Sequence, residues 1–333
     1  MRRDTRIQII AAAVLVVCMA ASGLLTVAIA AESGRAQLGY ADRAEESDPP
    51  EVALGIALGA FRGLFVNILW IRAQDLKQEG KFHEAIELSR TITRLQPRFP
   101  RVWGFHAWNM AYNISVATSS AEERWQWVKA GINLLRDEGI PKNPNDVMLH
   151  KELAWLFIHK IQGYADDANH YYKRQLAREW TIVLGSPPPR AETFEATKTE
   201  YVEWLQTFSS AAPTLEALYQ RHPRAEEFVR RMREEAQLEP DFNFLRQVEM
   251  IQAVYRAWTP SGMVLELAES ERNEPLERLV ADYAGDEEAV AAIEALILHT
   301  RRRILTEEYH MELPRMIRYT RRFGPFDWRH PAS

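Results

Sequence analysis

The stretch that most constrains this chain covers residues 69–108, LWIRAQDLKQEGKFHEAIELSRTITRLQPRFPRVWGFHAW. Small residues return within it in similar surroundings, as Ala73 and Ala107 show. Gly80 permits a tight turn, and Pro97 cannot continue a helix. Between these two breaks, small and apolar residues follow a helical period, at Ala85, Leu88, Ser89, Ile92 and Leu95. The stretch therefore predicts a helical hairpin followed by the first helix of a second hairpin.

The order of small, large, turn and terminating residues in this stretch is typical of one family of helical repeats. These positions are occupied by Ala73, Leu76, Gly80, Phe82, Ala85 and Pro97, and the opening of the unit returns at Trp103, Ala107 and Met110. The pattern resembles the tetratricopeptide repeat, and the separation of Ala73 and Ala107 equals the period of that repeat. More loosely, the chain is similar to a group of bacterial membrane-anchored proteins that carry such repeats. The resemblance implies stacked helical hairpins that bind a protein or peptide.

The N-terminal segment has the character of a membrane anchor. Residues 7–31 contain no charged residue over 25 positions, enough for a helix to cross a bilayer. Three arginines precede this segment and an acidic stretch, residues 32–51, follows it. The positive-inside rule then places the N-terminus in the cytoplasm and the bulk of the chain outside it, in the periplasm. A cleaved signal peptide stays open as an alternative, because Ala28, Ile29 and Ala30 resemble a cleavage site.

A second apolar run, residues 52–71, allows two interpretations. Gly55, Gly59 and Gly63 leave one helix face bare, which suits a membrane helix pair and a helical repeat equally. Arg62 lies within the run, and a central arginine costs about 2.5–3.5 kcal/mol on membrane insertion. We therefore expect a soluble or interfacial helix here. A second span would instead return the rest of the chain to the cytoplasm.

The second repeat unit is expected to form helices over residues 103–116 and 121–137. Ser120 and Glu123 form a capping box at the start of the second of these helices. Its end is predicted from three residues that break helices, Gly139, Pro141 and Pro144. A third unit begins near Asp146 and turns at Gly163. Its packing stripe is expected at Leu153, Ala154, Phe157, Ile158 and Ile161.

The segment GSPPP at residues 185–189 interrupts the repeat pattern and predicts a domain boundary. Further helical patterns follow it, including capping residues at Asn273 and Asp286. The expected architecture is all-α, with an N-terminal transmembrane helix, a tetratricopeptide-like α-solenoid and a helical C-terminal region. The predicted parts are an anchor or signal peptide, an acidic linker, a repeat domain and the C-terminal region, at residues 1–31, 32–51, 52–189 and 190–333.

Composition and motifs exclude several functional classes. The net charge of −5 argues against a nucleic-acid partner held by bulk charge. The single cysteine, Cys18, cannot form a disulfide within the chain. The sequence contains no phosphate loop, no G-x-S-x-G, no dinucleotide fingerprint and no H-E-x-x-H. No catalytic residue, cofactor or metal ion is therefore assigned, and the chain is not expected to be an enzyme.

One polar cluster supports an alternative function. Asp166 and His170 share a helix face at a spacing of four, Asp167 lies beside them, and His159 lies across the turn at Gly163. Such side chains are accepted by zinc and other divalent ions. We expect a hydrogen-bonded pair that steadies the hairpin. The alternative is a metal-dependent or enzymatic helical module that uses these four residues.

The predicted function is a membrane-tethered scaffold or adaptor. In the family that the chain resembles, the first helix of each unit lines a concave surface. Here these helices carry side chains that can hydrogen-bond an extended backbone, namely Arg72, Gln74, Gln78, His106, Asn109 and Asn113. The anchor favours a membrane-associated protein or peptide partner. Most of the seven tryptophans between residues 69 and 184 are expected in the core, with one of Trp125 and Trp127 at the surface.

Overall fold

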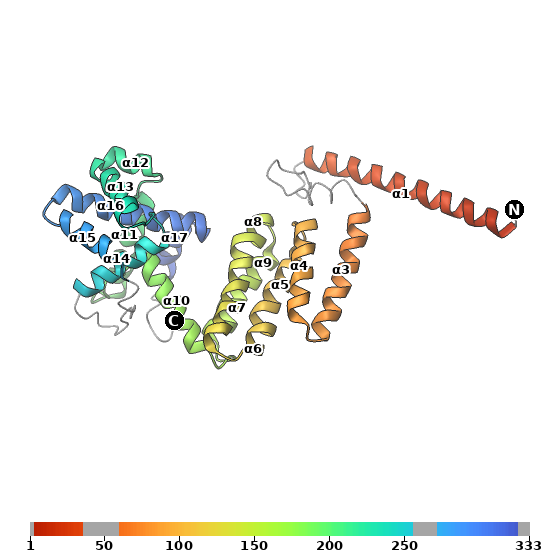
Figure 1. Cartoon of the computed structure of the whole chain (residues 1–333), viewed down its shortest axis with the longest axis horizontal. Helices are drawn as coiled ribbons and strands as arrows, with labels where there is room; N and C mark the ends of the chain where they lie inside the picture. The colour runs from red at the N-terminus through yellow and green to blue at the C-terminus, as the bar shows by residue number, and fades with distance from the viewer. Residues whose placement is uncertain (1–2, 36–59, 256–271, 326–333) are drawn as a thin grey trace. The chain divides into compact units, whose positions relative to one another are not determined.

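The structure, a computed structural model, describes residues 3–35, 60–255 and 272–325 of the 333-residue chain (Figure 1). Every regular element within these ranges is a helix, which confirms the all-α prediction. The chain divides into two compact units, Met1–Asn169 and His170–Ser333. Much of the acidic linker, the start of the second apolar run and the aromatic C-terminus lie outside the described residues.

The N-terminal segment forms one long helix, α1 (Arg3–Arg35). Large apolar side chains are exposed along it, including Val14, Val17 and Leu24. Within the described residues, no helix combines the length and the apolar character that crossing a membrane requires.

The first predicted hairpin is formed by α3 (Ala60–Gln78) and α4 (Phe82–Leu95), which pack side by side (Figure 1). Gly80 lies between them with φ of +76°, a conformation that glycine adopts without strain. The small residues Ala73 and Ala85 are fully buried, as expected where two helices approach closely. The spacing of small residues therefore predicted this packing correctly.

The second predicted repeat begins with α5 (Pro100–Trp108). This helix continues without a break through the π-helical segment η1 (Asn109–Ile114) into α6 (Ser115–Ala117). Its partner is a second continuous helix, formed by α7 (Ala121–Asn133), η2 (Leu134–Gly139) and α8 (Ile140–Lys142). Ser120 caps α7, since its hydroxyl accepts the backbone N–H of Glu123 at 3.2 Å. The predicted helix start at Ser120 is thus confirmed.

The predicted end of this second helix was wrong. Gly139 and Pro141 both lie inside it, and the helix runs on to Lys142. Gly139 serves packing, because a Cβ at this position would lie 3.3 Å from Cβ of Trp103 on α5. Pro141 lies in the last turn of the continuous helix, one residue before its end at Lys142.

The third predicted repeat begins with α9 (Val147–Trp155) and η3 (Leu156–Gln162). Gly163 follows η3, where the turn was predicted. Asp146 caps α9 by accepting the backbone N–H of Leu149 at 2.9 Å. The predicted packing stripe was wrong in part, because Ala154 and Ile158 are exposed. Of the predicted stripe, Ile161 is buried, and it is joined by Leu149, Leu156 and Lys160, which the stripe did not include. The i→i+5 bonding of η3 changes the helical period, so a stripe drawn at the α-helical period does not follow it.

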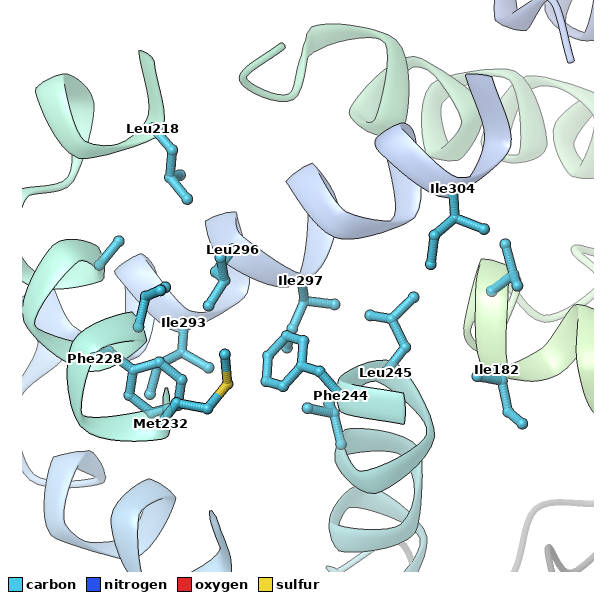
Figure 2. Packing of buried hydrophobic residues seen from close by; sticks show 14 of the residues in the cluster. Ile182, Leu218, Phe228, Met232, Phe244, Leu245, Ile293, Leu296, Ile297 and Ile304 are labelled. Carbon is cyan, nitrogen blue, oxygen red and sulfur yellow. The ribbon is translucent and has the colours of Figure 1, made fainter. Parts of the chain in front are cut away.

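The C-terminal unit contains α10 (Asn169–Leu184) from His170 onward and the helices that follow it. These are α11 (Phe194–Ser210), α12 (Leu215–Arg221), α13 (Pro223–Glu235), α14 (Phe242–Tyr255), α15 (Glu274–Tyr283), α16 (Glu287–Arg303), η5 (Ile304–Glu308) and α17 (Leu313–Phe323). Figure 2 shows its core, in which Leu296 and Ile297 of α16 lie among residues of α13 and α14 such as Phe228 and Phe244.

The two units meet in the chain at Asn169, before the boundary expected at residues 185–189. Three residues at the end of α10 explain the difference, since Ile182, Val183 and Leu184 are buried in the core of the C-terminal unit. The breaker segment that follows is an irregular connection between α10 and α11 within this unit. Gly185 has φ of +74° and lies against the guanidinium of Arg301.

Candidate functional site

The six residues predicted to bind a partner do not share one surface. Arg72 and Gln78 are exposed on α3, and Gln74 is half-buried there. His106 and Asn109 have no exposed surface at all, so neither can contact a partner. This corrects the prediction for both residues, because the side of α5 and η1 that carries them faces neighbouring helices.

Two of the other predicted binding residues, Asn113 and Arg72, interact with residues close to them in the chain. Asn113 donates a hydrogen bond from its side-chain nitrogen to the side-chain oxygen of Asn109, four residues earlier in η1. Arg72 lies 3.6 Å from Glu79 in an exposed ion pair. These interactions link residues close together in the chain, and they do not create a groove.

A different set of residues forms a continuous surface on the first helices of the second and third units. We call it the aromatic strip and define it as Phe105, Trp108, Tyr112, Trp155 and His159. Trp108 stacks on Tyr112 with ring centres 4.8 Å apart, and Trp155 stacks on His159 at 4.9 Å. The hydroxyl of Tyr112 lies 3.1 Å from Nδ1 of His159 and joins the two stacked pairs.

The strip extends to the first unit through Lys77 of α3. Its ammonium group lies 4.8 Å from the ring centre of Trp108 and 5.5 Å from that of Phe105, which are cation–π distances. Side chains of α3, of α5 with η1, and of α9 with η3 therefore form one row. The row lies on α3, α5, η1, α9 and η3, the helices that open each unit.

Much of the strip is accessible to a partner. Trp108 is 38% exposed and Trp155 is 45% exposed, and Ile158, which precedes His159 in η3, is 57% exposed. Large apolar side chains that gather on a surface mark interaction sites more often than isolated ones do. The rings are also held in place by their stacking partners, so a ligand would meet a preformed surface.

The environment of Tyr112, at the centre of the strip, favours its protonated hydroxyl. Burial raises the pKa of Tyr112 to about 12, and the negative charge of Glu152 acts in the same direction. Tyr112 therefore keeps its proton at neutral pH, and its hydroxyl can donate to Nδ1 of His159. Tyr112 lies in η1 and His159 in η3, and π-helical segments often occur at functional sites.

The polar cluster at residues 159–170 is not a ligand set. Asp166 is buried and forms an ion pair with Lys160, and Arg124 lies 3.4 Å from the same carboxylate. His159 belongs to the aromatic strip, while Asp167 and His170 are exposed. Across the described parts of the chain, no three His, Cys, Asp or Glu side chains come together in a way that could hold a metal ion. The cluster instead holds the turn after η3 through a buried ion pair.

A repeated pair in the sequence could have identified the strip. Trp108 and Tyr112 are four residues apart, as are Trp155 and His159, and this spacing places both members of a pair on one helix face. One of Trp125 and Trp127 was expected at the surface, but these two residues are less exposed than Trp108 and Trp155. Trp125 and Trp127 are both half-buried, and Trp127 contacts the ring of His83 at 5.5 Å.

No known family model matches this chain, and no curated protein or solved structure shows significant similarity to it.

Proposed function

We propose that this protein is a scaffold whose aromatic strip binds a peptide segment of another protein. The observation that carries the proposal is the pair of exposed tryptophans, Trp108 and Trp155, each held flat against a neighbouring ring. Tryptophan and tyrosine dominate the binding energy of protein interfaces, and they do so best where their conformations are fixed beforehand.

The shape of the strip favours an extended segment as the ligand. A row of side chains that crosses successive helices offers several anchor points along a line, and a single compact pocket would not. Apolar side chains of the peptide would lie on Trp108, Trp155 and Ile158. Lys77 at the α3 end favours an acidic residue in that part of the peptide.

The repeat architecture is part of the same proposal. The hairpin of α3 and α4 is followed by a second antiparallel pair built on α5 and α7, and α4 packs against α5. Ala73 and Ala107 are both fully buried and stand one repeat period apart, which supports equivalent roles in two successive units. We infer a tetratricopeptide-like solenoid from this recurrence.

The test of the scaffold proposal is the double variant Trp108→Ala/Trp155→Ala. Each truncation of an interface tryptophan costs about 2 kcal/mol or more, a factor of about 30 in affinity. Partners that co-purify with the wild-type chain from native membranes should therefore be lost, as quantified by mass spectrometry. The matched control is Tyr319→Ala, a more exposed aromatic residue of the C-terminal unit. Equal recovery of the same partners by the double variant would refute the proposal.

The membrane tether is a separate proposal that rests on sequence, because no described helix meets the requirements of a span. Its support is the uncharged segment at residues 7–31, which is helical and exposes apolar side chains. We expect a reporter fused after Ser333 that is active only when exported to be active. Activity of a cytoplasmic reporter alone at the same position would show that the chain has a different topology.

A further inference from the structure

A cavity of about 360 Å³ lies within the C-terminal unit, between α10, α11, α17 and the short segment that joins η5 to α17. It shares no residue with the aromatic strip, which belongs to the N-terminal unit. Its size is within the range of small-molecule sites, about 300–1,000 Å³. A ligand in this cavity would contact the C-terminal unit alone, so its binding does not depend on the scaffold proposal.

The apolar walls of the cavity include side chains that retain accessible surface. Trp180 of α10 and Trp204 of α11 are half-buried, as are Met311, in the segment before α17, and Met316 of α17. Aromatic rings pack favourably on indoles, and the polarisable sulfur of methionine also makes favourable contacts with them. A flat aromatic body in the cavity would therefore cover apolar surface that is otherwise left to water.

The fold holds these walls in place. The ring of Trp204 makes an edge contact with the fully buried Phe208, with ring centres 5.1 Å apart. The ring of Trp180 contacts that of Tyr309 in the same way at 5.8 Å. The backbone N–H of Met311 donates to a carbonyl oxygen of η5 at 2.8 Å, which fixes the segment before α17. A ligand would therefore meet a surface that needs little rearrangement.

The charge of α17 favours an anion at the mouth of the cavity. This helix carries four arginines and no acidic residue, and one of the arginines, Arg315, lines the cavity. Arg315 is exposed, and its Nη2 lies 3.0 Å from Glu312. An exposed pair of this kind contributes little to stability, and a guanidinium has five N–H donors, so Arg315 can also bind a second carboxylate. The N-terminal end of α17 lies at the same place, and its dipole acts in the same direction.

We propose that this cavity binds a small aromatic carboxylate. The aromatic body lies against the two tryptophans and the two methionines of the walls, and the carboxylate pairs with the guanidinium of Arg315. Glu312 shares this guanidinium with the ligand and repels the negative charge of the ligand. Removing the charge of Glu312 therefore strengthens binding, whereas removing the charge of Arg315 weakens it.

The experiment measures binding of three indole probes to the full-length chain by isothermal titration calorimetry. Indoleacetate carries the carboxylate, indoleacetamide is its neutral counterpart, and tryptamine carries a positive charge on a similar frame. We expect saturable binding of indoleacetate, about fivefold tighter than that of indoleacetamide because the bond to Arg315 is charge-assisted. Tryptamine should bind more weakly than either.

Two variants locate the carboxylate. In Arg315→Gln, the preference for indoleacetate over indoleacetamide should fall towards one, while indoleacetamide still binds. In Glu312→Gln, indoleacetate should bind about twofold tighter or more. The side chain of Glu312 makes no capping hydrogen bond, so this change leaves the start of α17 intact. The matched control is Arg318→Gln, an exposed arginine of α17 that does not line the cavity, and it should keep the wild-type preference.

A third variant tests the position of the aromatic body. Met311→Trp places a larger side chain at the cavity and should weaken indoleacetate and indoleacetamide at least about tenfold. Equal binding by the wild type and by a folded Met311→Trp variant, as judged by circular dichroism, would overturn the proposal. It is also overturned if indoleacetate does not bind saturably to the wild type, if tryptamine binds more tightly than indoleacetate, or if Arg315→Gln keeps the wild-type preference.

Discussion

The burial of His106 should make the stability of the N-terminal unit fall in mild acid. The pKa of this imidazole is lowered from 6.5 to about 4, first by burial and then by the positive charge of Arg90. The unfolded chain takes up the proton near the ordinary value, whereas the folded chain resists it. Between these two values the unfolded state binds more protons, so lowering the pH destabilises the folded state. The stabilising contribution is complete above pH 6.5 and is lost as the pH falls towards 4.

The size of this effect follows from the linkage relation. Between about pH 7.5 and about pH 5, a pKa difference of this size reduces the free energy of unfolding by about 2 kcal/mol. The assay is urea unfolding followed by tryptophan fluorescence at these two pH values, for the wild type and for His106→Gln. Glutamine cannot titrate, so the variant should lose about 2 kcal/mol less than the wild type over this interval.

The difference between the two proteins is the quantity that tests the reasoning. All other residues are the same in both proteins, so the difference reports on His106 alone. The control is His83→Gln, which replaces an exposed histidine on α4 and should keep the wild-type pH profile. Identical pH profiles for the wild type and His106→Gln would show that His106 is as easily protonated in the folded chain as in the unfolded one. That result would refute its burial as the cause.

Three further substitutions test the packing of the N-terminal unit by urea unfolding. Gly131→Ala should destabilise it by about 1–3 kcal/mol, since the new Cβ would lie 2.8 Å from the backbone oxygen of Ala107. The control, Gly104→Ala, should be tolerated because the nearest atom to its new Cβ would be 3.7 Å away. Lys160→Met should cost about 3–5 kcal/mol, because it removes the positive charge that lies beside the buried carboxylate of Asp166. If the loss of stability is no larger than for Lys151→Met, which changes an exposed lysine, the buried ion pair does not stabilise the fold as argued. Ala73→Phe should cost at least about 1–3 kcal/mol through overpacking, and unchanged unfolding would show that α3 and α4 do not meet there.

Helix starts were predictable from sequence because a cap is a local interaction. Ser120, Asp146, Asn273 and Asp286 each accept a backbone N–H within the first turn of the helix that follows. Each of these hydrogen bonds joins residues only two or three positions apart, so no knowledge of the rest of the fold is needed. The turn at Gly80 was predictable for the same reason.

Burial was less predictable because it depends on residues far apart in the chain. Lys160 is buried at a position that a hydrophobic stripe would leave to an apolar residue, and it is tolerated there because Asp166 is buried beside it. Gly139 does not end its helix, because its role depends on Trp103 in another helix. No pattern within a single helix contains this information.

The two errors at His106 and Asn109 come from assigning the same exposure to positions 34 residues apart. One repeat period earlier in the chain, the equivalent positions are Arg72 and Asp75 of α3, which are exposed. On α5 and η1, the equivalent face lies against the preceding helix α4. Arg90 and Arg94 of α4 and His106 of α5 surround the same small hollow. On α3 itself these positions are not covered in this way, because Arg72 and Asp75 are exposed.

A groove inferred from Arg72 and Asp75 by periodicity cannot continue onto α5 and η1, because the corresponding residues there, His106 and Asn109, are fully buried. A position that recurs in every unit is exposed only where no neighbouring unit covers it. Trp108 and Tyr112 of the second unit and Trp155 and His159 of the third remain together on one face in spite of these neighbours. A binding surface that crosses several repeats has to consist of residues of this kind, which is why the aromatic strip, and not the polar face of α3, is the surface on which a partner is expected to bind.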